Sequence, residues 1–321
     1  MKKLAKKLIV AAVSAITITA SALSLTACGG DASKLKILDV TLTGEQYGYC
    51  VNKTDTTIMT EVNSLIEKLC GNSAYDPENT SSFNAEGIQY DFDGNGTDET
   101  VTFKTIYDAV INGTANDIGE VPPSVPAGKT PDDCLIVATN AEFEPFEYKN
   151  GNKYAGVDMW IAKILAETLN KTLVIKDMEF DVVITDVETG ASHIGMAGLT
   201  INHGREQLVT FSKGYYKTTQ SIAVAEDETA FDSCTTEAQV RAVIEGMGKV
   251  NAGAASGQTG YYYIVGSTDF EFAGFANVTA KDYDSIGLAV QNLSNGKLKF
   301  VVGDKDTLTS AVTEINSHIG K

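Results

Sequence analysis

The chain from Cys134 onward alternates between strand-like and helix-like segments, and this alternation restricts the possible folds more than any other feature. Residues 135–139 (LIVAT) form an apolar run, residues 156–169 carry apolar side chains at helical spacing, and residues 172–178 form a second apolar run. A strand, a helix and a strand at this spacing predict a right-handed crossover and a parallel sheet. We therefore expect an α/β fold in which mostly parallel sheets are flanked by helices.

The same pattern continues to the end of the sequence. Residues 231–247 predict a helix, a Gly-rich turn precedes another helix that starts near Thr259, residues 297–303 predict a strand, and residues 306–318 predict a closing helix. The chain is longer than a single hydrophobic core usually supports, so we expect two lobes.

The first residues have the order of parts of a secretory signal. Four lysines within residues 2–7 precede an apolar run at residues 8–25, and the run ends in LTAC at Cys28. LTAC resembles a bacterial lipobox, which implies removal of the signal peptide (residues 1–27) and lipidation of Cys28. Residues 28–33 would then be a lipid-anchored linker, and the protein would be extracytoplasmic and held to the cell membrane by its lipid. The alternative is a transmembrane helix, because the apolar run approaches spanning length.

Charge and cysteine content exclude some partners and leave others open. Removal of residues 1–27 takes away four of the 25 Lys and Arg and none of the 42 Asp and Glu, which leaves a net charge near −21. A surface of this charge is a poor partner for nucleic acid. Four cysteines remain after Cys28, and outside the cell they could pair in three ways: Cys50, Cys70, Cys134 and Cys234.

Residues 71–133 separate the first elements from the α/β alternation. Within them, Asp91, Asp93, Asn95 and Glu99 have the offsets of a calcium loop, but the twelfth position is Thr102 in place of the bidentate Glu. A metal-free β-hairpin, with strands in GIQYDF and TVTF, is the interpretation that we favour. A short helix at residues 104–111 and a Pro-rich strap at residues 119–133 follow.

The front of the chain raises a problem of packing. Residues 43–51 resemble a strand, and residues 56–69 carry apolar side chains on one helical face. A single strand and helix cannot bury enough surface to be stable alone. The residues that directly follow are polar and rich in turns, so the partner of this unit must lie elsewhere in the sequence.

Five segments together resemble the family 3 extracellular solute-binding proteins, which are the amino-acid receptors of ABC importers. They are residues 135–169, 177–180 (DMEF), 195–216 (containing GLTINHGR), 253–263 (GAASGQTGYYY) and 295–306 (NGKLKFVVGDKD). The resemblance implies a two-lobed, type II periplasmic-binding-protein-like fold. It also implies a protein without a cofactor, an ABC transporter permease as partner, and most simply a monomer.

The order of the segments implies a circular permutation. In this family EQYG and the strand-helix unit usually come last, whereas here they come first. Residues 71–133 would then connect the usual C-terminus to the usual N-terminus, which is tolerated where termini are close. Lobe 1 would comprise residues 42–219 and lobe 2 residues 34–41 and 220–321. We expect residues 34–40 to join the second sheet, EQYGYCV to lie beside the first, and Val62 and Ile66 to be buried against lobe 1. Cys70 and Cys134 would flank the connection and could form a disulfide.

The resemblance assigns a binding site for a free amino acid. Arg205 would bind the ligand carboxylate bidentately, Thr200 in the loop of Gly198 would add donors, and Thr259 would offer a helix N-terminus. Asp304 would bind the ammonium group. The side chain of the ligand would lie near three further residues: Asn140, Phe143 and Phe180.

The matched positions favour a neutral ligand. Relatives that bind glutamine, histidine or lysine commonly carry Asp where this chain has Asn140. No second Arg or Lys appears in the matched positions, so a dicarboxylic amino acid is disfavoured by its unpaired charge. A neutral amino acid is therefore the first choice, and Glu142 or Glu144 near the mouth keeps a basic one open.

Two other functions remain open. Enzymes such as cyclohexadienyl dehydratases use the same fold, but no nucleophile with a neighbouring base suggests itself here, and we assign no catalytic residue. A sensory ligand-binding domain usually precedes a transmembrane helix or a signalling module, and neither follows in this sequence.

Overall fold

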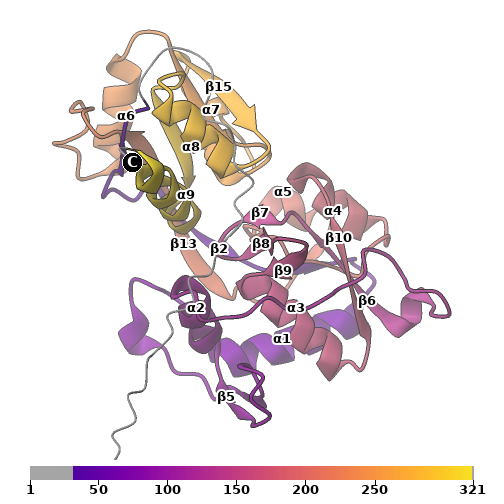
Figure 1. The fold of residues 1–321 in the computed structure, drawn as a ribbon. Coiled ribbons are helices and arrows are strands. Elements are labelled where there is room, and N and C mark those ends of the chain that lie inside the picture. The colour runs from indigo at the N-terminus through magenta and orange to yellow at the C-terminus, as the bar shows by residue number, and fades with distance from the viewer. Residues whose placement is uncertain (1–31, 320–321) are drawn as a thin grey trace, which may run out of the picture.

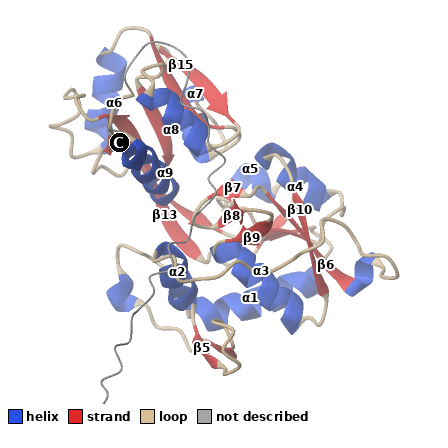
Figure 2. Ribbon diagram, in the orientation of Figure 1, coloured by secondary structure: helices blue, strands red, loops and turns tan. Residues whose placement is uncertain are grey.

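The computed structural model describes residues 32–319, which form two α/β lobes joined by a pair of strands (Figures 1 and 2). The signal peptide and the lipidation site at Cys28, expected from the sequence, lie outside the described residues. None of the helices within residues 32–319 is long and apolar enough to cross a membrane.

The first lobe is built on a five-stranded sheet. Parallel pairing joins β10, β6 and β11, and antiparallel pairing adds β3 and β12 at the other edge. Helices cover the two faces of this sheet (Figure 2). Its elements are β3 (Cys50–Val51), β6 (Cys134–Thr139), β10 (Thr172–Asp177), β11 (Ile194–Gly195), β12 (Thr210–Phe211), α1 (Thr56–Cys70), α3 (Val157–Thr168), α4 (Phe180–Glu188) and α5 (His203–Glu206). A small antiparallel sheet lies beside it: β7 (Glu142–Phe143), β8 (Glu147–Asn150) and β9 (Lys153–Ala155).

The second lobe is built on a six-stranded sheet. Parallel pairing joins β15, β14 and β16, while β13 pairs antiparallel with β16, β1 and β2. Its elements are β1 (Leu35–Ile37), β2 (Thr43–Tyr47), β13 (Tyr216–Ala225), β14 (Val250–Ala255), β15 (Val278–Tyr283), β16 (Phe300–Asp304), α6 (Glu237–Gly246), α7 (Thr259–Val265), α8 (Ile286–Ser294) and α9 (Lys305–His318).

The front of the chain contributes to both sheets, as expected from the sequence. Strand β1 pairs with β13 of the second lobe, so that Leu35 lies opposite Ala225. Strand β3 pairs with β11 and β12 of the first lobe. Helix α1 buries Val62 and Ile66 in the core of the first lobe. The unit that could not be stable alone therefore finds its partners far downstream.

Strand β2 and residues 216–220 of β13 form an antiparallel pair between the lobes, which we call the hinge ribbon. Figure 1 shows both strands in the gap between the two lobes. Thr218 lies opposite Glu45, and Tyr216 lies opposite Tyr47. Side chains two residues apart on a strand point to the same face, so Glu45, Tyr47, Thr218 and Gln220 share one face of the ribbon.

Residues 71–133 pack on the rest of the chain. Tyr75 forms a β-bridge with Tyr216 of the hinge ribbon, and the indole of Trp160 donates to the carbonyl of Asn116 at 2.9 Å. The expected hairpin is confirmed as β4 (Ile88–Tyr90) and β5 (Glu99–Val101), and the expected short helix as α2 (Phe103–Ile111). Figure 1 shows α2 near the lower end of α9.

Several expectations from the sequence need correction. Cys50, Cys70, Cys134 and Cys234 are all free thiols, so the disulfide between Cys70 and Cys134 is wrong. Cys70 packs in the main core of the first lobe, whereas Cys134 packs with Ile136 and Val174 in a separate cluster.

Helix α6 and strand β16 start later than expected. The helix begins at Glu237 because the Thr236 side chain caps it by accepting from the backbone of Gln239. The strand begins at Phe300.

Candidate functional site

Residues from both lobes meet at the hinge ribbon. Thr200 lies in the loop after β11, Arg205 is in α5, Thr259 begins α7, and Asp304 ends β16. The hydroxyl oxygens of Thr200 and Thr259 are 3.2 Å apart, and Arg205 Nη2 donates to the carbonyl of Gly257 at 3.3 Å. Ser256 also donates to Asp181 across the gap at 3.0 Å. The two lobes are therefore in contact with each other at these residues.

Arg205 is held by backbone carbonyls and an aromatic ring. Its Nη1 donates to the carbonyl of Thr200 at 2.9 Å, and its guanidinium lies 5.2 Å from the ring centre of Phe180. Burial lowers the pKa of Arg205, which still remains protonated at neutral pH. Among the ion pairs of residues 32–319, none involves Arg205. A half-buried cation without a carboxylate partner is suited to an anionic ligand group.

Asp304, at the end of β16 in the second lobe, is a buried residue of the same site. Its Oδ1 accepts from the hydroxyl of Tyr47 at 2.5 Å, and the residue is 4% exposed. Burial raises the pKa of Asp304 to about 6. The ion pairs of the described residues do not include Asp304, so its charge is available to a cationic ligand group.

Glu45 of the hinge ribbon belongs to the same site, although sequence reasoning missed it. Its Oε2 accepts from Thr200 at 2.7 Å and from Thr259 at 2.8 Å, and thus joins the two lobes. Burial, followed by the charge of Asp304, raises the pKa of Glu45 to about 7. The available signal was strand alternation, which places Glu45 on the same face as Tyr47, the hydrogen-bond partner of Asp304.

Three predicted site residues have structural contacts within the first lobe. Asn140 donates to the carbonyl of Met178 at 2.9 Å. Phe143 is 4% exposed, and its ring centre lies 6.0 Å from that of Tyr47. Gly198 has φ +53°, and a Cβ at this position would come within 2.4 Å of the Phe143 ring. Gly198 is therefore required where the binding loop passes over Phe143.

The loop of Gly198 is hydrogen-bonded to a buried carboxyl group, that of Asp158. Asp158 Oδ2 accepts from the backbone of Gly198 at 3.3 Å, and the hydroxyls of Tyr49 and Tyr215 also donate to Asp158. Burial raises the pKa of Asp158 to about 6. Burial and the charge of Asp158 also raise the pKa of the neighbouring Glu147 well above its usual value.

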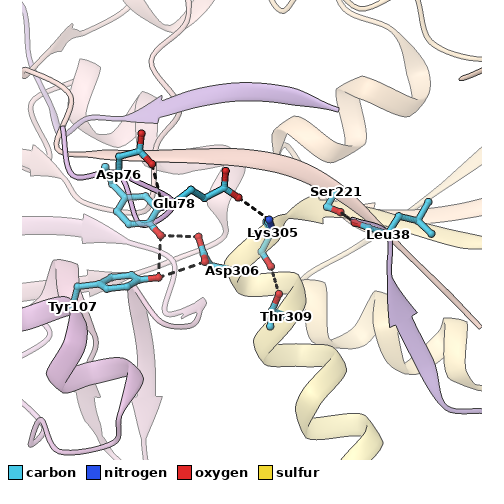
Figure 3. A network of polar contacts seen from close by, with 9 residues as sticks. Leu38, Asp76, Glu78, Tyr107, Ser221, Lys305, Asp306 and Thr309 are labelled. Carbon is cyan, nitrogen blue, oxygen red and sulfur yellow. Dashed lines mark hydrogen bonds and ion pairs between the residues drawn. The ribbon is translucent and has the colours of Figure 1, made fainter. Parts of the chain in front are cut away.

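A second polar cluster lies beside this site and involves residues 71–133. Asp306 Oδ2 accepts from Tyr216 at 2.7 Å, and its Oδ1 lies 3.4 Å from the hydroxyl of Tyr107. Lys305 pairs with Glu78 at 2.6 Å. Figure 3 shows Tyr107 and Glu78 reaching toward Asp306 and Lys305 at the start of α9. The connecting residues thus link both lobes.

A cavity of about 930 Å³ borders the hinge ribbon. Glu45, Thr200 and Asn202 line it together with Asp269, Glu271 and Lys305. Arg205, Thr259 and Asp304 are not among its lining residues. The cavity therefore adjoins the site at Glu45 and Thr200 without including all of it.

The calcium-like loop is held by its own hydrogen bonds. Asp91 Oδ2 accepts from the backbone of Gly96 at 2.9 Å, and Asp93 accepts from the backbone of Asn95 at 3.0 Å. Glu99 belongs to strand β5. The part of the chain that the structure describes contains no group of three or more His, Cys, Asp or Glu side chains arranged to hold a metal ion.

Residues 135–319 match the family model for bacterial extracellular solute-binding proteins, family 3. The chain belongs to this family. Membership agrees with the two α/β lobes and with a site between them. It establishes the resemblance that the sequence segments indicated.

Three similar proteins illustrate the range of the family. The chain is 33% identical over 93 residues to the arginine-binding extracellular protein ArtP of Bacillus subtilis. The matched residues cover 29% of this chain and 36% of ArtP. The chain is 31% identical over 101 residues to a cyclohexadienyl dehydratase of Pseudomonas aeruginosa, which covers 31% and 38%. A solved structure of an ancestral arginine-binding protein bound to arginine has 28% identity, a TM-score of 0.49, and coverage of 59% of this chain and 76% of the other. The chain thus spans less than half the length of these two curated relatives.

Proposed function

We propose that this protein is the extracytoplasmic substrate-binding component of an amino-acid ABC importer, and that it binds one free amino acid between its lobes. The observation that carries the proposal is a pair of charges that form no ion pair within the described residues, Arg205 from the first lobe and Asp304 from the second, near the Thr200–Thr259 contact. A free amino acid presents a carboxylate and an ammonium group on one carbon. Arg205 would take the first and Asp304 the second.

Binding requires the lobes to open. Thr200 and Thr259 touch in the closed form, and Arg205 already reaches the carbonyl of Gly257. A ligand would enter after these contacts separate, and closure would then bring Arg205 and Asp304 to the same molecule. The hinge ribbon is the connection about which the lobes would move.

We also propose that the chain is a circular permutant of its family, with lobe boundaries at residues 42–219 and at 34–41 with 220–321. Support comes from β1 and β3, which precede the family match and yet pair within both sheets. The contacts of Tyr75 with Tyr216 and of Glu78 with Lys305 fit a connection that was added between old termini. The lipid on Cys28 would tether the protein at the second lobe.

A thermal-shift screen of the twenty common amino acids tests the proposed function. A ligand that binds only the folded protein raises its melting temperature by mass action. We expect one amino acid, or a few similar ones, to raise it by several degrees at millimolar concentration. A screen in which no amino acid moved the melting temperature would contradict the proposal.

An enzyme on the same fold is the alternative. The observation that favours it is Glu45, because a buried carboxyl group with a pKa of about 7 could act as a general acid. Incubation of a bound ligand with catalytic amounts of protein distinguishes the two. A receptor returns the ligand unchanged, whereas an enzyme converts it to product.

A further inference from the structure

We infer that the hinge ribbon carries a recognition site for a positively charged ligand side chain, formed by Glu45, Thr218 and Gln220 beside Asp304. The inference rests on the proposed function and names its substrate class. In place of the neutral amino acid that the matched positions favoured, the ligand is a cationic one.

The first observation is a group of buried polar atoms without hydrogen-bond partners. Glu45 Oε1, Thr218 Oγ1 and both amide atoms of Gln220 are buried without a hydrogen-bond partner of good geometry, although the Gln220 amide lies close enough to Glu45 and Asp304 to lower the pKa of each. Thr218 is 6% exposed and Gln220 is fully buried. All three side chains lie on one face of the hinge ribbon, where Thr218 is directly opposite Glu45. Such atoms are costly to bury unless something satisfies them.

The second observation is the chemical character of these atoms. The carboxylate oxygen of Glu45, the hydroxyl of Thr218 and the amide oxygen of Gln220 can all accept hydrogen bonds, whereas the amide nitrogen of Gln220 is a donor and is served by the neighbouring carboxylates of Glu45 and Asp304. Asp304 adds a carboxylate within range to raise the pKa of Glu45. An ammonium or guanidinium group offers only donors, so its chemistry complements this set.

The third observation is the balance of charge. Arg205 contributes one positive charge, while Glu45 and Asp304 contribute two negative charges when ionised. None of the three is in an ion pair with another described residue. A neutral amino acid would leave one buried carboxylate uncompensated, whereas a cationic amino acid would compensate both.

The arrangement also links binding to pH. Glu45 is faced by Asp304 from β16, Arg205 from α5 and the hydroxyls of Thr200 and Thr259. A bound cation would lower the pKa of Glu45 from about 7, so the cation would displace a proton from part of the population near neutral pH. Affinity for the cation should therefore rise between pH 5 and pH 8.

The test is calorimetry on the full mature chain with L-arginine and L-citrulline, which have the same shape but differ in side-chain charge. We expect arginine to bind at least tenfold more tightly than citrulline at pH 8. At pH 5 the difference in affinity between the two compounds should be smaller. Arginine binding at pH 7 should release protons, seen as a dependence of the heat on the ionisation enthalpy of the buffer. Glu45→Gln retains an oxygen for Thr200 and Thr259 but removes the charge, and should reduce the preference to threefold or less. Glu86→Gln, at an exposed residue before β4 that does not line the cavity, is the matched control and should leave the preference unchanged.

Equal affinity for arginine and citrulline, with no proton release, would overturn the inference while leaving amino-acid binding intact. In that case the buried atoms of the ribbon bind only water. An unchanged preference in folded Glu45→Gln would also overturn it. Failure to bind either compound or any other amino acid would overturn the proposed function as well. If Glu45→Gln did not fold, the pH dependence and proton release of the unmodified protein would still decide the question.

Discussion

Asp304 and Asp306 are two residues apart, where β16 passes into α9. They differ in whether the polar atoms around them have hydrogen-bond partners. Asp306 lies between the hydroxyls of Tyr107 and Tyr216, and the neighbouring Lys305 has Glu78 as its partner. Asp304 accepts from Tyr47 and lies beside Glu45, whose Oε1 is buried without a hydrogen-bond partner, as is Oγ1 of Thr218 opposite Glu45. Burial raises the pKa of both carboxyl groups.

The difference between these two clusters indicates their roles. A buried polar cluster that is complete within the protein stabilises the fold, whereas one that is incomplete lowers the stability of the empty protein. The cluster around Asp306 is therefore structural, and the cluster around Asp304 is suited to a ligand. Changes at the two should affect different properties.

Removal of the front of the chain should have the largest effect, because both clusters depend on it. A protein that starts at Asp132 lacks β1, β2, β3, α1 and α2, and with them Glu45, Tyr47 and Tyr107. We expect it to be insoluble or without fixed tertiary structure, as judged by near-ultraviolet circular dichroism and urea unfolding. A folded protein with intact ligand binding would show that residues 34–131 form an independent domain.

Arg205→Ala should abolish binding and leave the fold intact. The ligand carboxylate would lose its charged partner, which costs several kcal/mol, or a factor of about 100 or more in affinity. Arg241→Ala is the control, because Arg241 lies in α6 and stacks on Phe275 at 4.3 Å, away from the site. Calorimetry that found the Arg205 variant within a few-fold of the unmodified protein would refute the site.

Asp304→Asn and Asp306→Asn should separate the two clusters. The first should lower affinity tenfold or more with little loss of stability, because an amide cannot neutralise the ammonium group. The second should lower the free energy of unfolding by about 1–3 kcal/mol, the usual range for losing a hydrogen bond to a charged group, and change affinity little. The comparison fails if both variants lose stability and affinity in the same proportion.

The empty protein should become less stable as the pH rises through the pKa values of the incomplete cluster. Glu45 and Asp304 have pKa values of about 7 and about 6 in the fold, above their ordinary values, so the folded state binds more protons than the unfolded state between about pH 4 and pH 7. Stability contributed by these protons is present at low pH and is lost as the pH rises. Glu45→Gln should therefore melt higher than the unmodified protein at pH 8 and close to it at pH 5. If the difference in melting temperature between Glu45→Gln and the unmodified protein were the same at pH 5 and pH 8, the raised pKa would not belong to Glu45.

The sequence predicts residues that lie within short local motifs. It does not show contacts that depend on pairing between strands far apart in the chain. Arg205, Thr200 and Thr259 were found because they lie within short motifs, and the structure brings them together at the hinge ribbon. Glu45 was missed because its role depends on pairing between β2 and a strand more than 160 residues away. Glu45 and Tyr47 both lie in the EQYG motif, but nothing local shows that the hydroxyl of Tyr47 reaches Asp304.

The remaining errors have physical causes as well. The start of α6 could have been predicted, since Thr236 and Gln239 have the spacing of a capping box. The disulfide could not be judged from the sequence, because Cys70 and Cys134 flank the same segment but point into different hydrophobic clusters. Spacing along the chain gives no side-chain direction across more than sixty residues.

Native mass spectrometry of the purified mature protein tests the central claim most directly, because it shows whether the lobes enclose an amino acid. After incubation with an equimolar mixture of the common amino acids and buffer exchange, we expect one added mass per chain. That mass should correspond to a basic amino acid and should be absent from Arg205→Ala treated in the same way. An unmodified protein that retained no amino acid, or an Arg205 variant that retained the same one, would contradict the account.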